Sequence, residues 1–149
     1  MSEELKKDLF ELTNETFELD KINADEAAPL LLAYIGDAVY EVVVRTIVIS
    51  KGNRPVEKLH RESIAYVNAA TQARMIEALM ESLSDTEASV YRRGKNAKSN
   101  TSAKNASLKD YHKATGFEAL VGYLYLKGEN ARMMELIKKG LELVGVKTK

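Results

Sequence analysis

Two acidic side chains stand in apolar stretches of the sequence, where a charge needs an explanation. Asp37 lies in LAYIGDAVYE directly after Gly36, and Glu118 lies in GFEALVGYLYL between Gly116 and Gly122. A charge beside a buried face has to be paired, protonated or bound to a cation. A glycine inside a helix costs about 1 kcal/mol relative to alanine, so these glycines indicate that another segment approaches closely.

The chemistry that the two carboxylates offer is the binding of a divalent cation. If their helices pack side by side, Asp37 and Glu118 share an ion such as Mg²⁺, which takes oxygen ligands and keeps several waters. Such an ion binds phosphate oxygens and lowers the pKa of a bound water, which supports phosphodiester hydrolysis without Cys or His. The alternative is an ordinary solvated or ion-paired side chain, as Glu41 illustrates, with Arg45 four residues further on. Composition and spacing leave both interpretations open.

Other catalytic chemistries are limited by what the chain lacks. Its 149 residues include no Cys and only 2 His, His60 and His112. A thiolate nucleophile and a Cys-ligated zinc site are therefore excluded, and a polyhistidine metal site within one chain is not expected. We expect His60, beside Lys58 and Arg61, to be a surface or interface residue.

Positive charge is concentrated in one segment, although 22 basic and 22 acidic residues give a net charge of zero. Residues 1–26 hold nine acids and three bases, whereas residues 91–113 hold seven bases and one acid. Gly, Asn, Ser and Thr separate these bases and can follow a sugar–phosphate backbone, a composition that suits recognition of a duplex by shape. A solvated charged face is the alternative.

The apolar pattern predicts one all-α domain of six or seven helices. From 27 to 49, a broad face includes Leu30, Leu31, Tyr34 and Val42, and Pro29 suits the first turn. Further helices are expected at 56–83 with a break near Asn68, from Ser84 to about 93, at 107–127 and at 130–143, with a loop at 94–106. No stretch approaches the roughly 20 apolar residues of a membrane span, and the N-terminus lacks a secretory signal, so we expect a cytoplasmic protein.

Three motifs in this order resemble a known family. LLAYIGDAVYEVVVR resembles the signature helix of the ribonuclease III catalytic domain, and ATGFEALVGYLYL resembles that family's second acidic motif. The match is closer still to the mini-ribonuclease III group, which has this domain without a double-stranded-RNA-binding domain and shares LAYIGDA, the pair Leu59-His60 and the basic loop RRGKNAKSNTSAKN. The resemblance covers about residues 27–145, which are expected to form the catalytic domain, with a tail at 146–149. The acidic segment 1–26 lies outside the resemblance and is expected to be an N-terminal extension with a short helix.

The resemblance implies a ribonuclease III-like helical bundle and a magnesium-dependent endoribonuclease for double-stranded RNA. Asp37 matches the family's principal catalytic aspartate and Glu118 its metal-binding glutamate. Ala33 and Thr115 stand where full-length ribonucleases III have further acids. The basic loop is expected to bind RNA through Arg92, Arg93, Lys95, Asn96, Lys98, Lys104 and Asn105.

The family further implies a homodimer in which each protomer cuts one strand of the duplex. For the mini group, the implied substrate is precursor 23S ribosomal RNA of the large subunit. Two sites are needed because the scissile phosphates of opposite strands face different directions across the minor groove.

Two other functions remain open at this point. One is a catalytically silent relative that holds structured RNA in ribosome assembly; the presence of Asp37 and Glu118 argues against it, while Ala33 and Thr115 leave it room. The other, judged without the resemblance, is an all-α magnesium-dependent nucleotide pyrophosphohydrolase. Those enzymes need clustered acids of the E-x-x-E type on one helix, and none is placed convincingly here.

Overall fold

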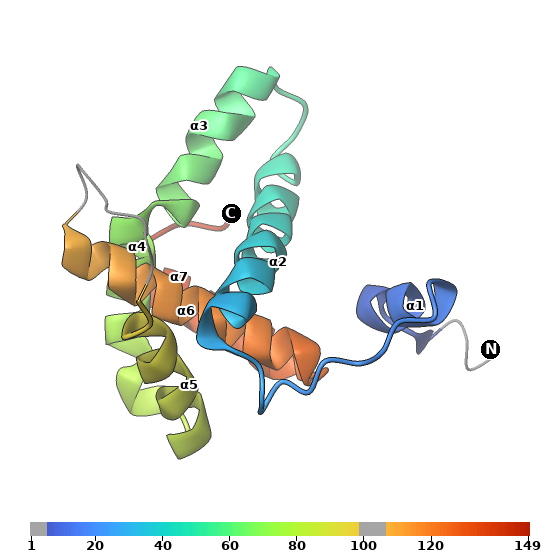
Figure 1. The fold of residues 1–149 in the computed structure, drawn as a ribbon. Helices are drawn as coiled ribbons and strands as arrows, with labels where there is room; N and C mark the ends of the chain where they lie inside the picture. Colours follow the sequence, from blue (N-terminus) through green and yellow to red (C-terminus); the bar gives the residue numbers. More distant parts are fainter. Residues whose placement is uncertain (1–5, 99–106) are drawn as a thin grey trace.

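The regular structure of the chain is entirely helical in the part that the computed structural model describes, residues 6–98 and 107–149 (Figure 1). The described residues form seven α-helices, a short 3-10 turn and no strand, which confirms the predicted all-α class. The elements are α1 (Leu9–Thr16), α2 (Pro29–Ile49), α3 (Val56–Val67), α4 (Ala69–Leu79), η2 (Met80–Ser82), α5 (Asp85–Lys95), α6 (Leu108–Leu126) and α7 (Asn130–Leu143). Within the same residues, none of these helices is long and apolar enough to cross a membrane.

Helix α6 is the centre of the fold. It runs through the middle of the molecule and packs against α2, α4, α5 and α7 (Figure 1). The run from Ala119 to Leu124 is buried without a gap, so this part of the helix is enclosed on every side. A carboxylate on α6, such as Glu118, is therefore held within the packed part of the molecule.

Helix boundaries follow the local signals in the sequence. Pro29 occupies the first turn of α2, and Asn68 separates α3 from α4 while its side chain caps α4. Ser84 forms the predicted capping box at the start of α5, and the Ser107 side chain accepts a hydrogen bond from the first turn of α6. These side chains satisfy backbone N–H groups that a helix N-terminus leaves without partners.

The predicted loop from residue 94 was wrong at its beginning, because α5 continues to Lys95. Gly94 packs directly on α6, where an added Cβ would lie 2.7 Å from the Ala119 Cβ and 3.0 Å from the Gly116 Cα. Tertiary contact thus holds a glycine in the last turn of the helix, although glycine has a low helix propensity. Lys95 is consequently placed on a helix rather than on a loop.

The predicted apolar face of α2 was wrong in part. Val39, Val43 and Ile47 on its edge pack against the core, but its other large side chains do not. Tyr34 is 83% exposed and Val42 is 63% exposed, and Leu30 and Leu31 are exposed as well. The opposite side of the helix is buried instead, through Leu32, Ala33, Gly36, Tyr40, Val44 and Val48. Because α2 is apolar around most of its circumference, periodicity alone could not choose between the two sides.

Candidate active site

Two glycines let the backbones of α2 and α6 touch. An added Cβ at Gly36 would lie 1.8 Å from the Glu118 carbonyl oxygen, and one at Gly122 would lie 2.0 Å from the Leu32 carbonyl oxygen. No side chain fits in that space, so the two positions require glycine. The crossing places Asp37, the residue after Gly36, next to Glu118.

The carboxyl groups of Asp37 and Glu118 lie within hydrogen-bonding reach of each other. Asp37 is exposed, whereas Glu118 is partly buried. Burial, followed by the negative charge of Asp37 and the hydrogen bond with it, raises the pKa of Glu118 to about 8. At neutral pH and without a cation, the Glu118 carboxyl group is therefore largely protonated.

Buried side chains enclose the pair from behind. Tyr40 is fully buried, donates a hydrogen bond from its hydroxyl to the Tyr66 carbonyl at 2.8 Å and packs edge-on against Phe117 at 5.3 Å between ring centroids. Gln72 of α4 is only 2% exposed, and its side chain partly opposes the rise in the pKa of Glu118. Gln72 is not predictable from the sequence, because an isolated glutamine between small residues gives no signal in an apolar pattern.

The donors present at the pair fit a magnesium ion. Within residues 6–98 and 107–149, no group of three or more His, Cys, Asp or Glu side chains could hold a metal ion. Ala33 offers no donor, and the Thr115 hydroxyl donates to the Tyr111 carbonyl of its own helix at 3.0 Å. Two carboxylates remain, which is the number that Mg²⁺ often takes from a protein while it keeps several waters. Asp37 and Glu118 are the residues that would hold it.

A basic cavity lies between the end of α5 and the start of α6. Its volume is about 330 Å³, and it is lined by Lys95, Asn96, Lys109, His112 and Lys113. Lys113 also pairs with Glu77 at 2.5 Å. Three lysines around one cavity favour a bound anion. Lys109, His112 and Lys113 were not among the predicted RNA-binding residues, although their spacing of three and four places them on one face of a helix.

The other predicted RNA-binding residues do not all share this surface. Arg93 donates to the Ala27 carbonyl at 3.4 Å and lines a different cavity together with Asp25 and Asp85. Arg92 and Lys98 are exposed. The predicted residues Lys104 and Asn105 lie outside the described part of the chain.

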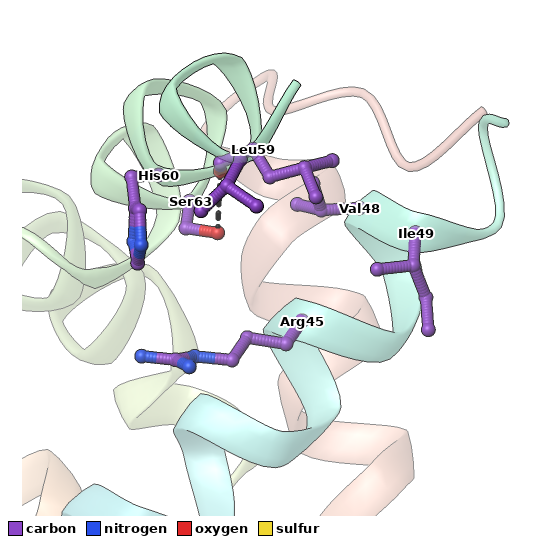
Figure 2. Close-up of a pocket in the computed structure, with 7 residues that line it drawn as sticks. Arg45, Val48, Ile49, Leu59, His60 and Ser63 are labelled. Carbon is purple, nitrogen blue, oxygen red and sulfur yellow. Dashed lines mark hydrogen bonds between the residues drawn. The ribbon is translucent and has the colours of Figure 1, made fainter. Parts of the chain in front are cut away.

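His60 lies apart from the carboxylate pair, in a small pocket between α2 and α3 (Figure 2). The pocket has a volume of about 170 Å³, and Figure 2 shows the Arg45 side chain extending from α2 beneath the His60 ring. Arg45 also pairs with Glu41 at 2.9 Å, as its spacing predicted. Neither Asp37 nor Glu118 lines this pocket.

Comparison with known proteins identifies the family. Residues 30–129 match the Ribonuclease III domain family. Mini-ribonuclease 3 of Clostridium tetani is 48% identical over 85% of this chain and 84% of its own length, and that of a Thermoanaerobacter species is 39% identical over 94% of this chain and 99% of its own length. The crystal structure of a Fusobacterium nucleatum protein has a TM-score of 0.71 and 26% identity, and covers 76% of this chain and 92% of that protein. The chain therefore belongs to the ribonuclease III family of RNA-hydrolysing endonucleases and, within it, to the mini-ribonuclease 3 group.

Proposed function

We propose that this protein is a magnesium-dependent endoribonuclease that cleaves double-stranded RNA. The observation that carries the proposal is the contact between Asp37 and Glu118 at a glycine-to-backbone helix crossing. Two neighbouring carboxyl groups, of which the partly buried Glu118 has a raised pKa, form a site that a divalent cation would neutralise. The membership of the ribonuclease III family makes a phosphodiester of RNA the bond to be cut.

The protein's own groups have separate roles in this mechanism. Asp37 and Glu118 would hold the cation, and Glu118 would release its proton to solvent in order to do so. Magnesium, when bound, supplies a water of lowered pKa and stabilises negative charge on the phosphate. Tyr40 and Phe117 form a fixed wall behind the carboxylates, so the pair does not have to reorganise during the reaction.

The basic cavity would orient the duplex. Lys95 and Lys109 offer positive charge to phosphates, which fixes the register of a duplex without reading its sequence. Lysines and small polar groups suit the phosphates and 2′-hydroxyls of A-form RNA. This contact would supply part of the grip that a separate RNA-binding domain supplies elsewhere in the family.

Precursor 23S ribosomal RNA is the substrate that we infer, and the cytoplasm is the location that follows from it. Support comes from the resemblance of the sequence motifs to the mini-ribonuclease III group and from the relatives named Mini-ribonuclease 3. Cleavage of a precursor 23S transcript at a few discrete positions, mapped by primer extension, is the expected result. Uniform cleavage of any duplex would contradict this narrower substrate.

A homodimer built on the outer face of α2 is the assembly that we propose. The α2 outer face, defined as Leu31, Tyr34, Val42 and Ile49, is apolar and exposed, opposite the side that packs on α6. An exposed apolar stripe of this kind marks an interaction surface, and a second copy of the chain would bury it symmetrically. Two copies would bring two carboxylate pairs to the two strands of one duplex.

Light scattering of the purified protein tests the dimer. We expect twice the 16.6 kDa of the chain for the wild type and a monomer for the double variant Tyr34→Asp, Val42→Asp. The matched control is Leu143→Asp, an exposed apolar residue at the end of α7, which should stay dimeric. A wild-type monomer at micromolar concentration would contradict the proposal.

The cleavage assay compares a long RNA duplex with either of its single strands, with Mg²⁺ and with EDTA. We expect discrete fragments from the duplex in Mg²⁺ alone. Binding of the duplex without cleavage at any Mg²⁺ concentration would favour the catalytically silent RNA-binding protein, for which Ala33 and Thr115 give a reason. Equal cleavage of single strands would contradict the duplex specificity.

A further inference from the structure

Helix α1 stands at the edge of the molecule, away from the helices that form the core (Figure 1). Within the described part of the chain, none of its 8 residues is buried, and Leu9 is 73% exposed. Leu12 and Phe17 of the same segment are exposed as well. Isolated helices shorter than about 12 residues are marginal in water, so α1 needs a surface that covers its apolar side chains.

The segment that carries α1, here called the arm and defined as residues 6–22, leaves the domain from a fixed point. Ala24 is buried, and the Asp25 carboxylate accepts hydrogen bonds from the Tyr123 hydroxyl at 2.6 Å and from the Lys127 ammonium at 3.0 Å. Both donors belong to the end of α6. The direction in which the arm leaves the domain is therefore set by the core.

Two contacts hold α1 to its own chain. The Phe10 ring packs edge-on against Tyr125 at 5.2 Å between ring centroids, and the Asn130 side chain donates a hydrogen bond to the Asp8 carboxylate at 2.9 Å. Leu12 stays exposed in spite of these contacts. They fix where α1 lies, but they leave its apolar side chains available to another surface.

A groove with mostly apolar walls lies between α2 and α7. Its volume is about 510 Å³, and its walls include Val42 and Ile47 from α2 and Ile137 and Leu141 from α7. A cavity of roughly 150 Å³ holds one benzene-sized group, so the groove has room for more than one apolar side chain. Val42 belongs both to this groove and to the α2 outer face, so a second copy that packs on that face also reaches the groove.

The charges of α1 and of the groove have opposite signs. Among the described residues, the charged side chains that line the groove are Lys138 and Lys149. Helix α1 carries Glu11 and Glu15 and no basic residue, and Lys7 pairs with Glu15 alone. Complementary charges at the edge of an interface steer association and fix its register, while the buried apolar contacts supply most of the affinity.

We propose that α1 is an exchanged arm, which docks Leu9 and Leu12 in the α2–α7 groove of a second copy of this chain. In its own chain, the contacts with Tyr125 and Asn130 hold α1 outside the groove, whose described lining includes no residue of the arm. In a two-fold dimer the exchange is reciprocal, so each chain fills the groove of its partner. The inference rests on the homodimer of the proposed function and adds a second contact to the α2 outer face.

Cross-linking tests the exchange directly, because the chain has no native Cys. Thr16 follows Leu12 at a spacing of four on the same helix face, and Thr46 lines the groove. We expect the double variant Thr16→Cys, Thr46→Cys to give a covalent dimer with a short bismaleimide, and mass spectrometry should show position 16 of one chain joined to position 46 of the other. The control pair Thr16→Cys, Leu108→Cys, whose second position is exposed at the start of α6, should stay monomeric. A link between 16 and 46 within one chain, or no link between them, overturns the exchange.

The affinity of the dimer gives the second measurement. Leu9→Ala combined with Leu12→Ala removes the proposed anchors and keeps a high helix propensity. We expect the dissociation constant of the dimer, measured by sedimentation, to rise about tenfold or more, since two apolar side chains lose their buried area. The control Leu143→Ala, at an exposed apolar residue outside the groove, should leave the dissociation constant unchanged. A wild-type dissociation constant in the arm variant would contradict the docking.

The exchange and the proposed function fail in different ways. A wild-type dimer whose groove pair does not cross-link overturns the exchange, while the dimer and the cleavage of duplex RNA in Mg²⁺ remain. A wild-type monomer overturns the homodimer and the exchange together. The comparison of duplex cleavage in Mg²⁺ and in EDTA decides the nuclease activity separately from both.

Discussion

The proton held by Glu118 is the residue-level feature that links stability to metal binding. Glu118 lies between Asp37 and buried side chains, so its ionised form is unfavourable until a cation compensates for it. Such perturbed carboxyl groups are typical of functional sites, where the protein accepts a cost in stability. The buried Oε1 of Gln72 on α4, which has no hydrogen-bond partner within residues 6–98 and 107–149, is a second cost in stability.

The metal-free protein should lose stability as pH rises from about 4.5 to about 8. Glu118 has an ordinary pKa of 4.5 when unfolded and a pKa of about 8 when folded. Between these values the folded state binds more protons than the unfolded state, so raising the pH favours unfolding. Replacing Glu118 with Gln should remove this dependence.

Thermal unfolding in EDTA from pH 5 to pH 9 checks this prediction by the difference between wild type and Glu118→Gln. As the pH rises, the melting temperature of the wild type should fall relative to that of the variant. Adding Mg²⁺ at high pH should raise the melting temperature of the wild type again. Parallel curves for the two proteins would show that Glu118 keeps its ordinary pKa.

The sequence alone could identify the two carboxylates but not the buried side chains of α4 that lie near them. Asp37 and Glu118 stand out because each is isolated in an apolar run beside glycine. Gln72 carries no such signal, since its burial depends on α4 packing against α6, which no local pattern encodes. His60 looked like a surface residue and is exposed, with Arg45 beside it.

At the scale of elements, the crossing of α2 and α6 is the feature on which the site depends. Gly36 should therefore not tolerate even alanine, because the added Cβ would lie 1.8 Å from a backbone oxygen of α6. Alanine ordinarily stabilises a helix by about 1 kcal/mol relative to glycine, so a large loss would be a packing effect. We expect Gly36→Ala to cost about 3 kcal/mol or more of unfolding free energy.

Gly140→Ala on α7 is the matched control for this change. Its added Cβ would meet the ends of flexible side chains, Leu79 and Met75, at 3.1 Å. Urea denaturation should show a much smaller loss for Gly140→Ala than for Gly36→Ala. Equal losses of unfolding free energy for the two variants would mean that the backbones of α2 and α6 lie further apart than in the structure.

A buried ion pair ties α5 to α7. Both carboxylate oxygens of Glu87 accept hydrogen bonds from Arg132, at 2.9 and 2.8 Å, and Glu87 is only 7% exposed. Arg132 lowers the pKa of Glu87, so the pair stabilises the fold above about pH 4.5 and this contribution is lost as the pH falls. Arg132→Met should cost about 2 kcal/mol at pH 7 and less at pH 3.

Urea titrations at the two pH values measure this difference, with Lys138→Met as the control. Lys138 and Glu142 are 3.9 Å apart and exposed, so their pair should contribute little. Similar losses for Arg132→Met and Lys138→Met would contradict a special role for the buried pair.

Local signals located the helices better than they located their buried faces. The capping residues Asn68, Ser84 and Ser107 mark real boundaries, because they bind backbone groups within one turn. The predictions for the buried side of α2 and for the last turn of α5 were wrong, because both features depend on contact with α6. Tertiary packing decides such cases, and the chain's local pattern does not contain it.

For the whole molecule, charge distribution matters more than net charge. The chain is neutral overall, yet Lys95, Lys109 and Lys113 gather around one cavity while the N-terminal segment is acidic. The sequence predicted the basic segment 91–113, and the structure shows that its Lys95, Lys109 and Lys113 line one cavity. Arg93 belongs to a different surface, beside Asp25 and Asp85.

Neutralising the basic cavity should weaken RNA binding and reduce its dependence on salt. Lys95→Gln combined with Lys109→Gln removes two positive charges and, with them, the release of about one counterion per lost phosphate contact. The slope of log affinity against log salt, measured with duplex RNA in EDTA, should fall by about two. Lys138→Gln on α7 is the control, and an unchanged slope in the double variant would remove this cavity from the RNA interface.

The central claim is that the Asp37–Glu118 pair is the metal centre that cuts duplex RNA. Asp37→Asn tests it most directly, since Asp37 is exposed and its replacement should leave the fold intact. With a long RNA duplex in Mg²⁺, the variant should bind with nearly wild-type affinity and produce no fragments. Cleavage at the wild-type rate by Asp37→Asn would contradict the account.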